Sequence, residues 1–178
     1  MATENLKTTA VTAAEATPPR RTNAGKGGAG LLRHIDGYLT ATTAMEATST
    51  YEMVIVPSEA IVKEVWAMLD TAVTTFTADL GVYYANTRDV PTDLRGDVID
   101  ADLWGSAIVF AGIVIPTQYT HEAAAAAFAV ADMQKELWDA AGLSADPKCN
   151  LAIVLTLTAS SDGAAIPYVA VKYVLPGS

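Results

Sequence analysis

The sequence predicts a mainly β protein: an antiparallel β-sandwich, of jelly-roll or immunoglobulin-like type, with one short helix and an extended N-terminal arm. Three observations lead to this class. Residues 75–84 alternate between apolar and more polar side chains, several other short runs are rich in β-branched residues, and Gly, Pro, Asp and Ser separate these runs. Alternation with period two is typical of a half-buried strand, and many short strands with turn residues between them favour a sandwich.

The first thirty residues have a different composition from the rest. They contain the pair Pro18-Pro19 and a glycine-rich cluster at 25–30, and they show neither helical nor strand periodicity. A segment of this kind cannot offset its ordering entropy by burial, so it is either disordered in isolation or fixed by a partner. The 178 residues leave room for one domain of roughly 140 residues besides such an arm. We therefore divide the chain into an extended arm, 1–30, and a sandwich domain, 31–178.

The strands follow from local pattern. In the clearest run five apolar side chains point to one face, namely Phe76, Ala78, Leu80, Val82 and Tyr84. Less regular runs of strand type lie at 31–41, 51–56, 61–69, 106–115, 150–158 and 166–175. Seven or eight strands in this arrangement are expected to pack as two antiparallel sheets.

One short helix is expected between residues 132 and 141, closing one end of the sandwich. Its apolar residues recur at helical spacing, at Met133, Leu137, Trp138 and Ala141. Asp132 could cap its start, and Gly142 would end it. Residues 97–104 are predicted to form one helical turn in a long loop. Residues 123–130 are ambiguous, because five consecutive alanines favour helix while a sandwich needs a strand nearby, and we favour a strand or irregular segment.

Charge is divided unevenly along the chain. Residues 1–33 carry five basic and two acidic residues, a net charge of +3, whereas the remainder carries six basic and eighteen acidic residues, a net charge of −12. A cationic arm on an anionic body favours assembly with a neighbouring copy or an acidic partner. Such a body would be repelled by the phosphates of nucleic acid. A hydrophobic content of 51% with 17% charged residues also favours an oligomer.

Motifs for enzymatic chemistry are weak. Gly25, Gly27 and Gly30 have the GxGxxG spacing, but no strand precedes them and no βαβ unit follows. The acidic loop with Asp93, Asp97, Asp100 and Asp102 matches no standard calcium loop.

A single cysteine and two distant histidines, His34 and His121, provide neither a metal constellation nor a catalytic triad. We therefore expect no enzyme activity, no catalytic residues, no metal and no cofactor. Cys149 leads into an apolar run and is expected to be a buried thiol. The tryptophans, Trp66, Trp104 and Trp138, are expected to be core or interface anchors.

Nothing in the sequence predicts a secretory signal or a membrane span. Glu4 stands close to the first residue, no apolar h-region follows it, and the longest apolar run covers only residues 107–115. We expect a soluble protein that does not bind membranes.

Four stretches resemble a family of small virion proteins of tailed bacteriophages: Ala2 to Lys7, Asp79 to Tyr84, Asp100 to Trp104 and Leu137 to Pro147. Members that look like this chain are similar to capsid decoration, or cement, proteins with a β-sandwich body. The alanine-rich residues 123–130 depart from the family's pattern.

The resemblance implies a non-enzymatic protein that binds the outer surface of the phage head and stabilises the shell by bridging capsomers. Its partners would be the major capsid protein and sister copies in a homotrimer, and its location the virion, after synthesis in the host cytoplasm. The arm contacts would come from Leu6 and Val11, docked in apolar grooves, and from Arg20, Arg21, Lys26 and Arg33, paired with carboxylates.

Two alternatives stay open at this point. The chain could be a neck, tail or head-fibre component of the virion, because fold does not settle role. It could also be a glycan-binding module or glycan hydrolase that uses the Asp93 to Asp102 loop, with Trp104 as a stacking platform.

Overall fold

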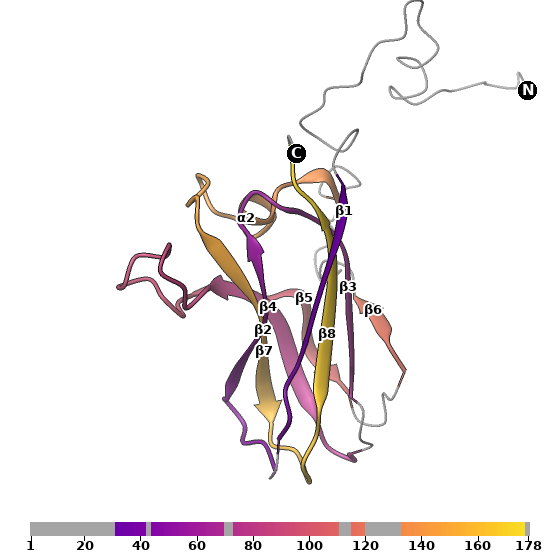
Figure 1. Cartoon of the computed structure of the whole chain (residues 1–178). Coiled ribbons are helices and arrows are strands. Elements are labelled where there is room, and N and C mark those ends of the chain that lie inside the picture. Colours follow the sequence, from indigo (N-terminus) through magenta and orange to yellow (C-terminus); the bar gives the residue numbers. More distant parts are fainter. Residues whose placement is uncertain (1–30, 42–43, 70–72, 111–114, 120–132, 177–178) are drawn as a thin grey trace, which may run out of the picture.

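The structure is a computed structural model that describes residues 31–41, 44–69, 73–110, 115–119 and 133–176. Its strands form two four-stranded sheets that face each other (Figure 1). Sheet A has the order β1-β8-β3-β6, made by β1 (Leu32–Tyr38), β8 (Pro167–Val174), β3 (Ile61–Leu69) and β6 (Thr117–Tyr119). Sheet B has the order β2-β7-β4-β5, made by β2 (Thr50–Pro57), β7 (Asn150–Ala159), β4 (Thr77–Tyr84) and β5 (Val98–Val109). The predicted antiparallel β-sandwich is confirmed.

The strand pairing is nested. The first strand pairs with the last, β2 with β7, β3 with β6, and β4 with β5, and every pair is antiparallel. The two halves of the chain thus run antiparallel to each other like one long hairpin. Its successive strand pairs belong to sheet A and sheet B in turn. This is the winding of a jelly roll, whereas an immunoglobulin sandwich has a different strand order. The topology therefore distinguishes between the two types that the sequence left open.

The core lies between the inner faces of the sheets. Phe76 and Phe110 are fully buried and meet edge to face, with ring centroids 5.7 Å apart. The inner rows of the long strands supply most of the remaining core, including Val65, Ala67, Leu69, Leu80, Val82, Ile153, Leu155, Val169 and Val171. These side chains alternate with outward ones, as the period-two pattern requires.

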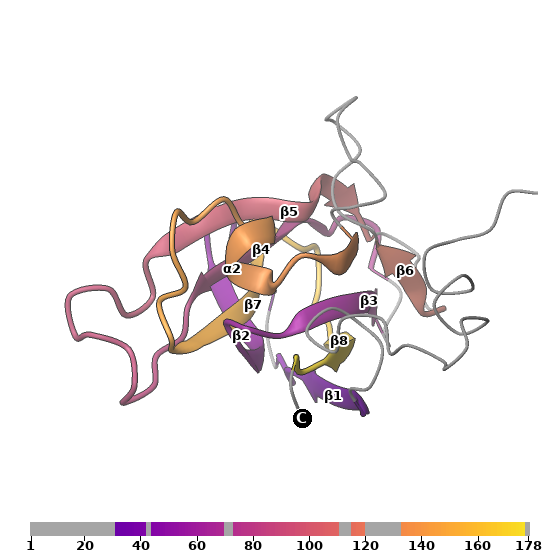
Figure 2. The same cartoon turned by 90° about the horizontal axis from the view of Figure 1, so that it is seen from above.

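The short helix α2 (Leu137–Ala140) lies at one end of the sandwich. Figure 2 looks down on this end and shows α2 over the strand ends between the two sheets. Leu137 is buried in the core, and its N–H donates to the Ala60 carbonyl at 2.8 Å. Gly142 follows with φ of 79°, a left-handed conformation that glycine adopts without strain and that ends the helix. The predicted helix is confirmed over a shorter range, and Asp132 lies outside the described residues.

The prediction for residues 97–104 is wrong. Instead of a helical turn, these residues begin β5, which pairs with β4 through three register shifts. The shifts accommodate the acidic residues of this segment at an edge strand. Further along β5, Ala107 takes a positive φ of 48°.

The predicted strand at 106–115 agrees with β5 only as far as Val109. Residues 111–114 lie outside the described residues, as does the ambiguous stretch 123–130. The other six predicted strands are confirmed within three residues at each end. Among the described residues, no helix is long and apolar enough to cross a bilayer.

Candidate interaction surfaces

The outward face of sheet A is the first candidate surface. Because Val65, Ala67 and Leu69 point into the core, the alternate residues of β3 point away from it. Strand pairing places the outward residues of β8 and β1 beside them. We call this surface the outer A face and define it as Asp36, Tyr38, Glu64, Trp66, Met68, Tyr168, Ala170 and Lys172.

Aromatic and apolar side chains form two adjacent rows on the outer A face. In one row Tyr38 of β1 pairs with Tyr168 of β8, which pairs with Met68 of β3. In the next row Ala170 stands between Asp36 and Trp66. Tyr38 is 70% exposed, and Tyr168 and Trp66 are half-buried. Antiparallel sheets that face water usually carry polar residues there, so this composition indicates a contact surface.

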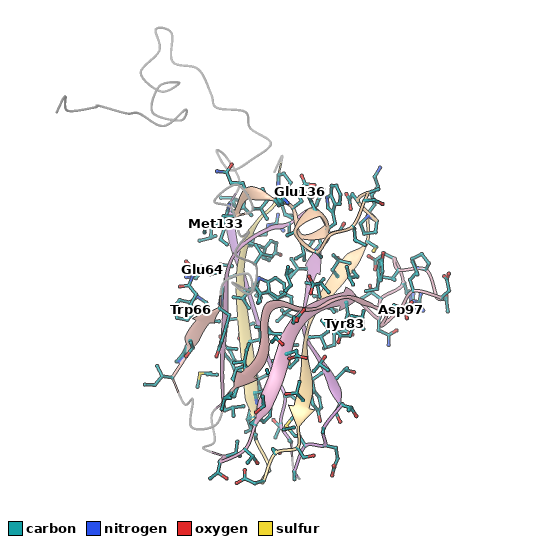
Figure 3. The ribbon with its side chains drawn as sticks, turned by 180° about the vertical axis from the view of Figure 1, so that it is seen from behind. Glu64, Trp66, Tyr83, Asp97, Met133 and Glu136 are labelled. Atoms are coloured by element: carbon teal, nitrogen blue, oxygen red, sulfur yellow. The ribbon has the colours of Figure 1, made fainter. Side chains whose placement is uncertain are left out.

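A hydrogen-bonded network fixes the orientation of the indole. Glu64 Oε2 accepts from Lys172 Nζ at 2.7 Å and from Trp66 Nε1 at 2.9 Å. The hydrogen bond from Lys172, followed by that from Trp66, lowers the pKa of Glu64 below its usual value. Figure 3 shows Glu64 and Trp66 on the same side of the molecule. The ring of Trp66 is thus held in place before any partner arrives.

Asp36 supplies a carboxylate beside the aromatic rows. Its Oδ1 lies 3.9 Å from Nδ1 of His34, and its side chain is 49% exposed. Burial, followed by the charge of Asp36, raises the pKa of Tyr168. The negative charge is therefore close enough to the tyrosine to affect it, and it stays accessible to a cation from outside.

The loop between β4 and β5 is the second candidate surface. It projects sideways from the body (Figure 1). Reciprocal backbone hydrogen bonds close its base, from Tyr84 N–H to the Asp97 carbonyl and from Gly96 N–H to the Tyr84 carbonyl, both at 2.9 Å. Arg95 Nε donates to the Val90 carbonyl at 3.0 Å inside the loop. These hydrogen bonds close the base of the loop and brace its interior.

The four aspartates of the acidic loop divide between two elements. Asp93 and Asp97 lie on the projecting loop, and Asp100 and Asp102 lie on β5. Burial, with the neighbouring Asp100 and then Asp79, raises the pKa of Asp102. Within the described part of the chain, no group of three or more His, Cys, Asp or Glu side chains is arranged to hold a metal ion.

The tryptophans have different environments. Trp104 is 3% exposed and belongs to the core, so its indole is not available to stack on a sugar. This burial removes the platform on which the glycan-binding alternative depended. Trp138 is half-buried, and its Nε1 donates to Glu136 Oε2 at 2.7 Å. Cys149 is buried as expected, and burial raises the pKa of its thiol.

One of the six predicted contact residues lies in the described part of the chain. Leu6, Val11, Arg20, Arg21 and Lys26 lie outside the described residues. Arg33 is exposed on β1, opposite Tyr173 of β8.

The outer A face was not predicted from the sequence, although a signal for it exists. Residues 64, 66 and 68 alternate with three core residues, and yet two of the three outward positions carry Trp and Met. Large apolar residues on both faces of an antiparallel strand indicate that something covers the outward face.

Comparisons with known proteins find the same fold in phage particles. No family model matches the chain, and no curated protein matches it. A chain in the capsid of Ralstonia phage GP4 superposes with a TM-score of 0.59 at 17% identity, over 85% of this chain and 89% of that one. A chain in the capsid asymmetric unit of cyanophage Pam1 superposes with a TM-score of 0.50 at 21% identity, over 91% and 97%. The chain therefore shares its fold with components of two phage capsid structures.

Proposed function

We propose that this chain is a phage capsid decoration protein, which binds the outer surface of the head and stabilises the shell by bridging capsomers. The observation that carries the proposal is the shared fold, which extends over most of this chain and most of each capsid chain. The role is structural and requires no catalytic residue.

The division of the chain suits this role. The sandwich of residues 31–178 is the rigid body, and residues 1–30 are an arm that reaches a neighbour. Leu6 and Val11 occupy apolar grooves, while Arg20, Arg21, Lys26 and Arg33 pair with carboxylates of the major capsid protein or of a sister copy. Copies associate as homotrimers on the capsid surface. Each contact across a capsomer boundary favours the assembled shell by mass action.

Deleting residues 2–30 tests the arm. We expect the shortened chain to lose most of its affinity for purified heads, measured by co-sedimentation. The full chain with Arg20→Ala and Arg21→Ala is the companion variant, because it removes two charges and keeps the length. Undiminished binding of both variants would remove the arm from the mechanism.

A neck, tail or head-fibre role is the second candidate. The same shared fold supports it, because capsid structures and other virion parts reuse sandwiches. Copy number separates the two roles, since a neck or tail ring holds only about six or twelve copies in cyclic symmetry.

A further inference from the structure

The outer A face combines aromatic rings with an accessible carboxylate. Tyr38, Tyr168 and Trp66 lie in adjacent rows, and Asp36 stands at the β1 edge of the same rows. Glu64 holds the Trp66 indole by a hydrogen bond and is itself paired with Lys172. Asp36 is thus the carboxylate of this surface with no lysine or arginine bonded to it among the described residues. The surface presents rings to an apolar group and one negative charge to a cation.

Proline and arginine together fit this chemistry. Extended proline-containing segments dock on surfaces lined by aromatic residues, because the polyproline conformation is already formed and loses little entropy. A guanidinium stacks on Tyr and Trp faces and also pairs with a carboxylate. The occupant predicted from the surface is therefore a short peptide with adjacent prolines and arginines.

The chain itself contains such a peptide, Pro18-Pro19-Arg20-Arg21. The prolines fix φ near the polyproline value. Residues 1–30 carry four basic and two acidic residues, a net charge of +2, while residues 31–178 carry seven basic and eighteen acidic residues, a net charge of −11. The charges of the segment and the body are therefore complementary.

The place where the described chain begins brings the peptide within reach. Leu31 immediately precedes β1, the edge strand of sheet A that carries Asp36 and Tyr38. Asp36 lies five residue steps along the chain from Leu31, about 17 Å in a strand. Residues 22–30 are nine in number and four of them are glycine. A glycine-rich sequence of that length reaches about 17 Å on average. The linker length matches the distance.

We propose that Pro18–Arg21 binds the outer A face, with its proline rings on Tyr38, Tyr168 and Trp66 and an arginine paired with Asp36. The inference rests on the proposed function only in treating the arm as a binding element, and it specifies where the arm docks on this chain or on a sister copy.

Photo-cross-linking of the full chain tests the proposal. A benzophenone amino acid replaces Thr17, next to the prolines, and the isolated protein is irradiated without particles. Peptide mapping is expected to find cross-links within β1, β3 and β8, and Asp36→Asn or Tyr38→Ala should each reduce their yield several-fold. Val109→Ala is the matched control, since Val109 is an exposed apolar residue on an edge strand of sheet B and should leave the yield unchanged.

Cross-links within one copy and cross-links between two copies both support the proposal. Cross-links on sheet B or the projecting loop would overturn it, as would a yield that neither face variant changes. Circular dichroism of each variant verifies that the fold is retained. If the full chain does not bind purified heads but still gives these cross-links, the proposed function alone is overturned. The two failures are therefore distinguishable.

Discussion

Gly81 of β4 packs directly against the backbone of β5. A Cβ atom added there would lie 2.2 Å from the Ala101 carbonyl oxygen and 2.3 Å from the Asp100 carbonyl oxygen. Both are backbone atoms of β5, which cannot rotate away as a side chain could. Gly81→Ala therefore requires β5 to move outward from β4.

The size of the effect follows from this geometry. An ordinary contact between carbon and oxygen is more than 3 Å, so the strand must shift by about 1 Å. Overpacking by one methyl group costs about 1–3 kcal/mol, and the irregular β4–β5 pairing offers few further hydrogen bonds to absorb the shift. We expect the free energy of unfolding to fall by about 2–3 kcal/mol, which lowers the Tm by roughly 4–12 °C in a domain of this size.

Urea denaturation followed by circular dichroism measures the change. Gly163→Ala is the matched control, because its Cβ would meet only Val73 Cγ1, at an ordinary contact distance of 3.9 Å. That variant should be neutral or slightly stabilising, since alanine restricts the unfolded chain. If Gly81→Ala stays within about 0.5 kcal/mol of the wild type, the described approach of β5 to β4 is refuted.

Three further predictions concern the core, a surface carboxylate and the thiol. Leu137→Ala should cost about 2–4 kcal/mol in urea denaturation because Leu137 is fully buried, while Met133→Ala, at a residue 44% exposed, should cost less than about 1 kcal/mol; equal losses would contradict the placement of α2. The folded state holds the pKa of Glu64 below its usual value, because Lys172 and then Trp66 donate hydrogen bonds to its carboxylate. Its stabilising contribution is therefore present above the usual pKa and is lost as the pH falls through the lowered pKa. The difference in unfolding free energy between the wild type and Glu64→Gln should accordingly be largest at neutral pH and vanish in acid, and a difference that does not change with pH would count against the network. Cys149, buried and with a raised thiol pKa, should react with a thiol reagent only as fast as the protein unfolds, and rapid labelling of the native protein would show that it is accessible.

Local pattern was sufficient for most of the fold. The run at 61–69 coincides with β3, and that at 150–158 differs from β7 by one residue, because their inner rows are strictly apolar. The prediction of a helical turn at 97–104 was wrong because acidic residues lower strand propensity. Register shifts at the edge strand β5 accommodate them in the structure. The jelly roll could not be distinguished from the immunoglobulin sandwich, because the pairing of β1 with β8 joins residues far apart in the sequence.

The candidate surface was less predictable. The role of Trp66 depends on Glu64, two residues away, and on Lys172, which only strand pairing brings near. Trp104, which looked like a stacking platform beside an acidic loop, is part of the core because β5 folds its segment inward. Isolated tryptophans in a sequence do not indicate which face of a sheet they will occupy.

The most direct test of the proposed function is the copy number of this chain in purified particles of the phage that the proposal assigns it to. Quantitative mass spectrometry against the major capsid protein measures it. A decoration layer predicts a ratio between about one to three and one to one, as expected for trimers distributed over the capsid lattice. A ratio near one to fifty, or absence from the particle, would contradict the account.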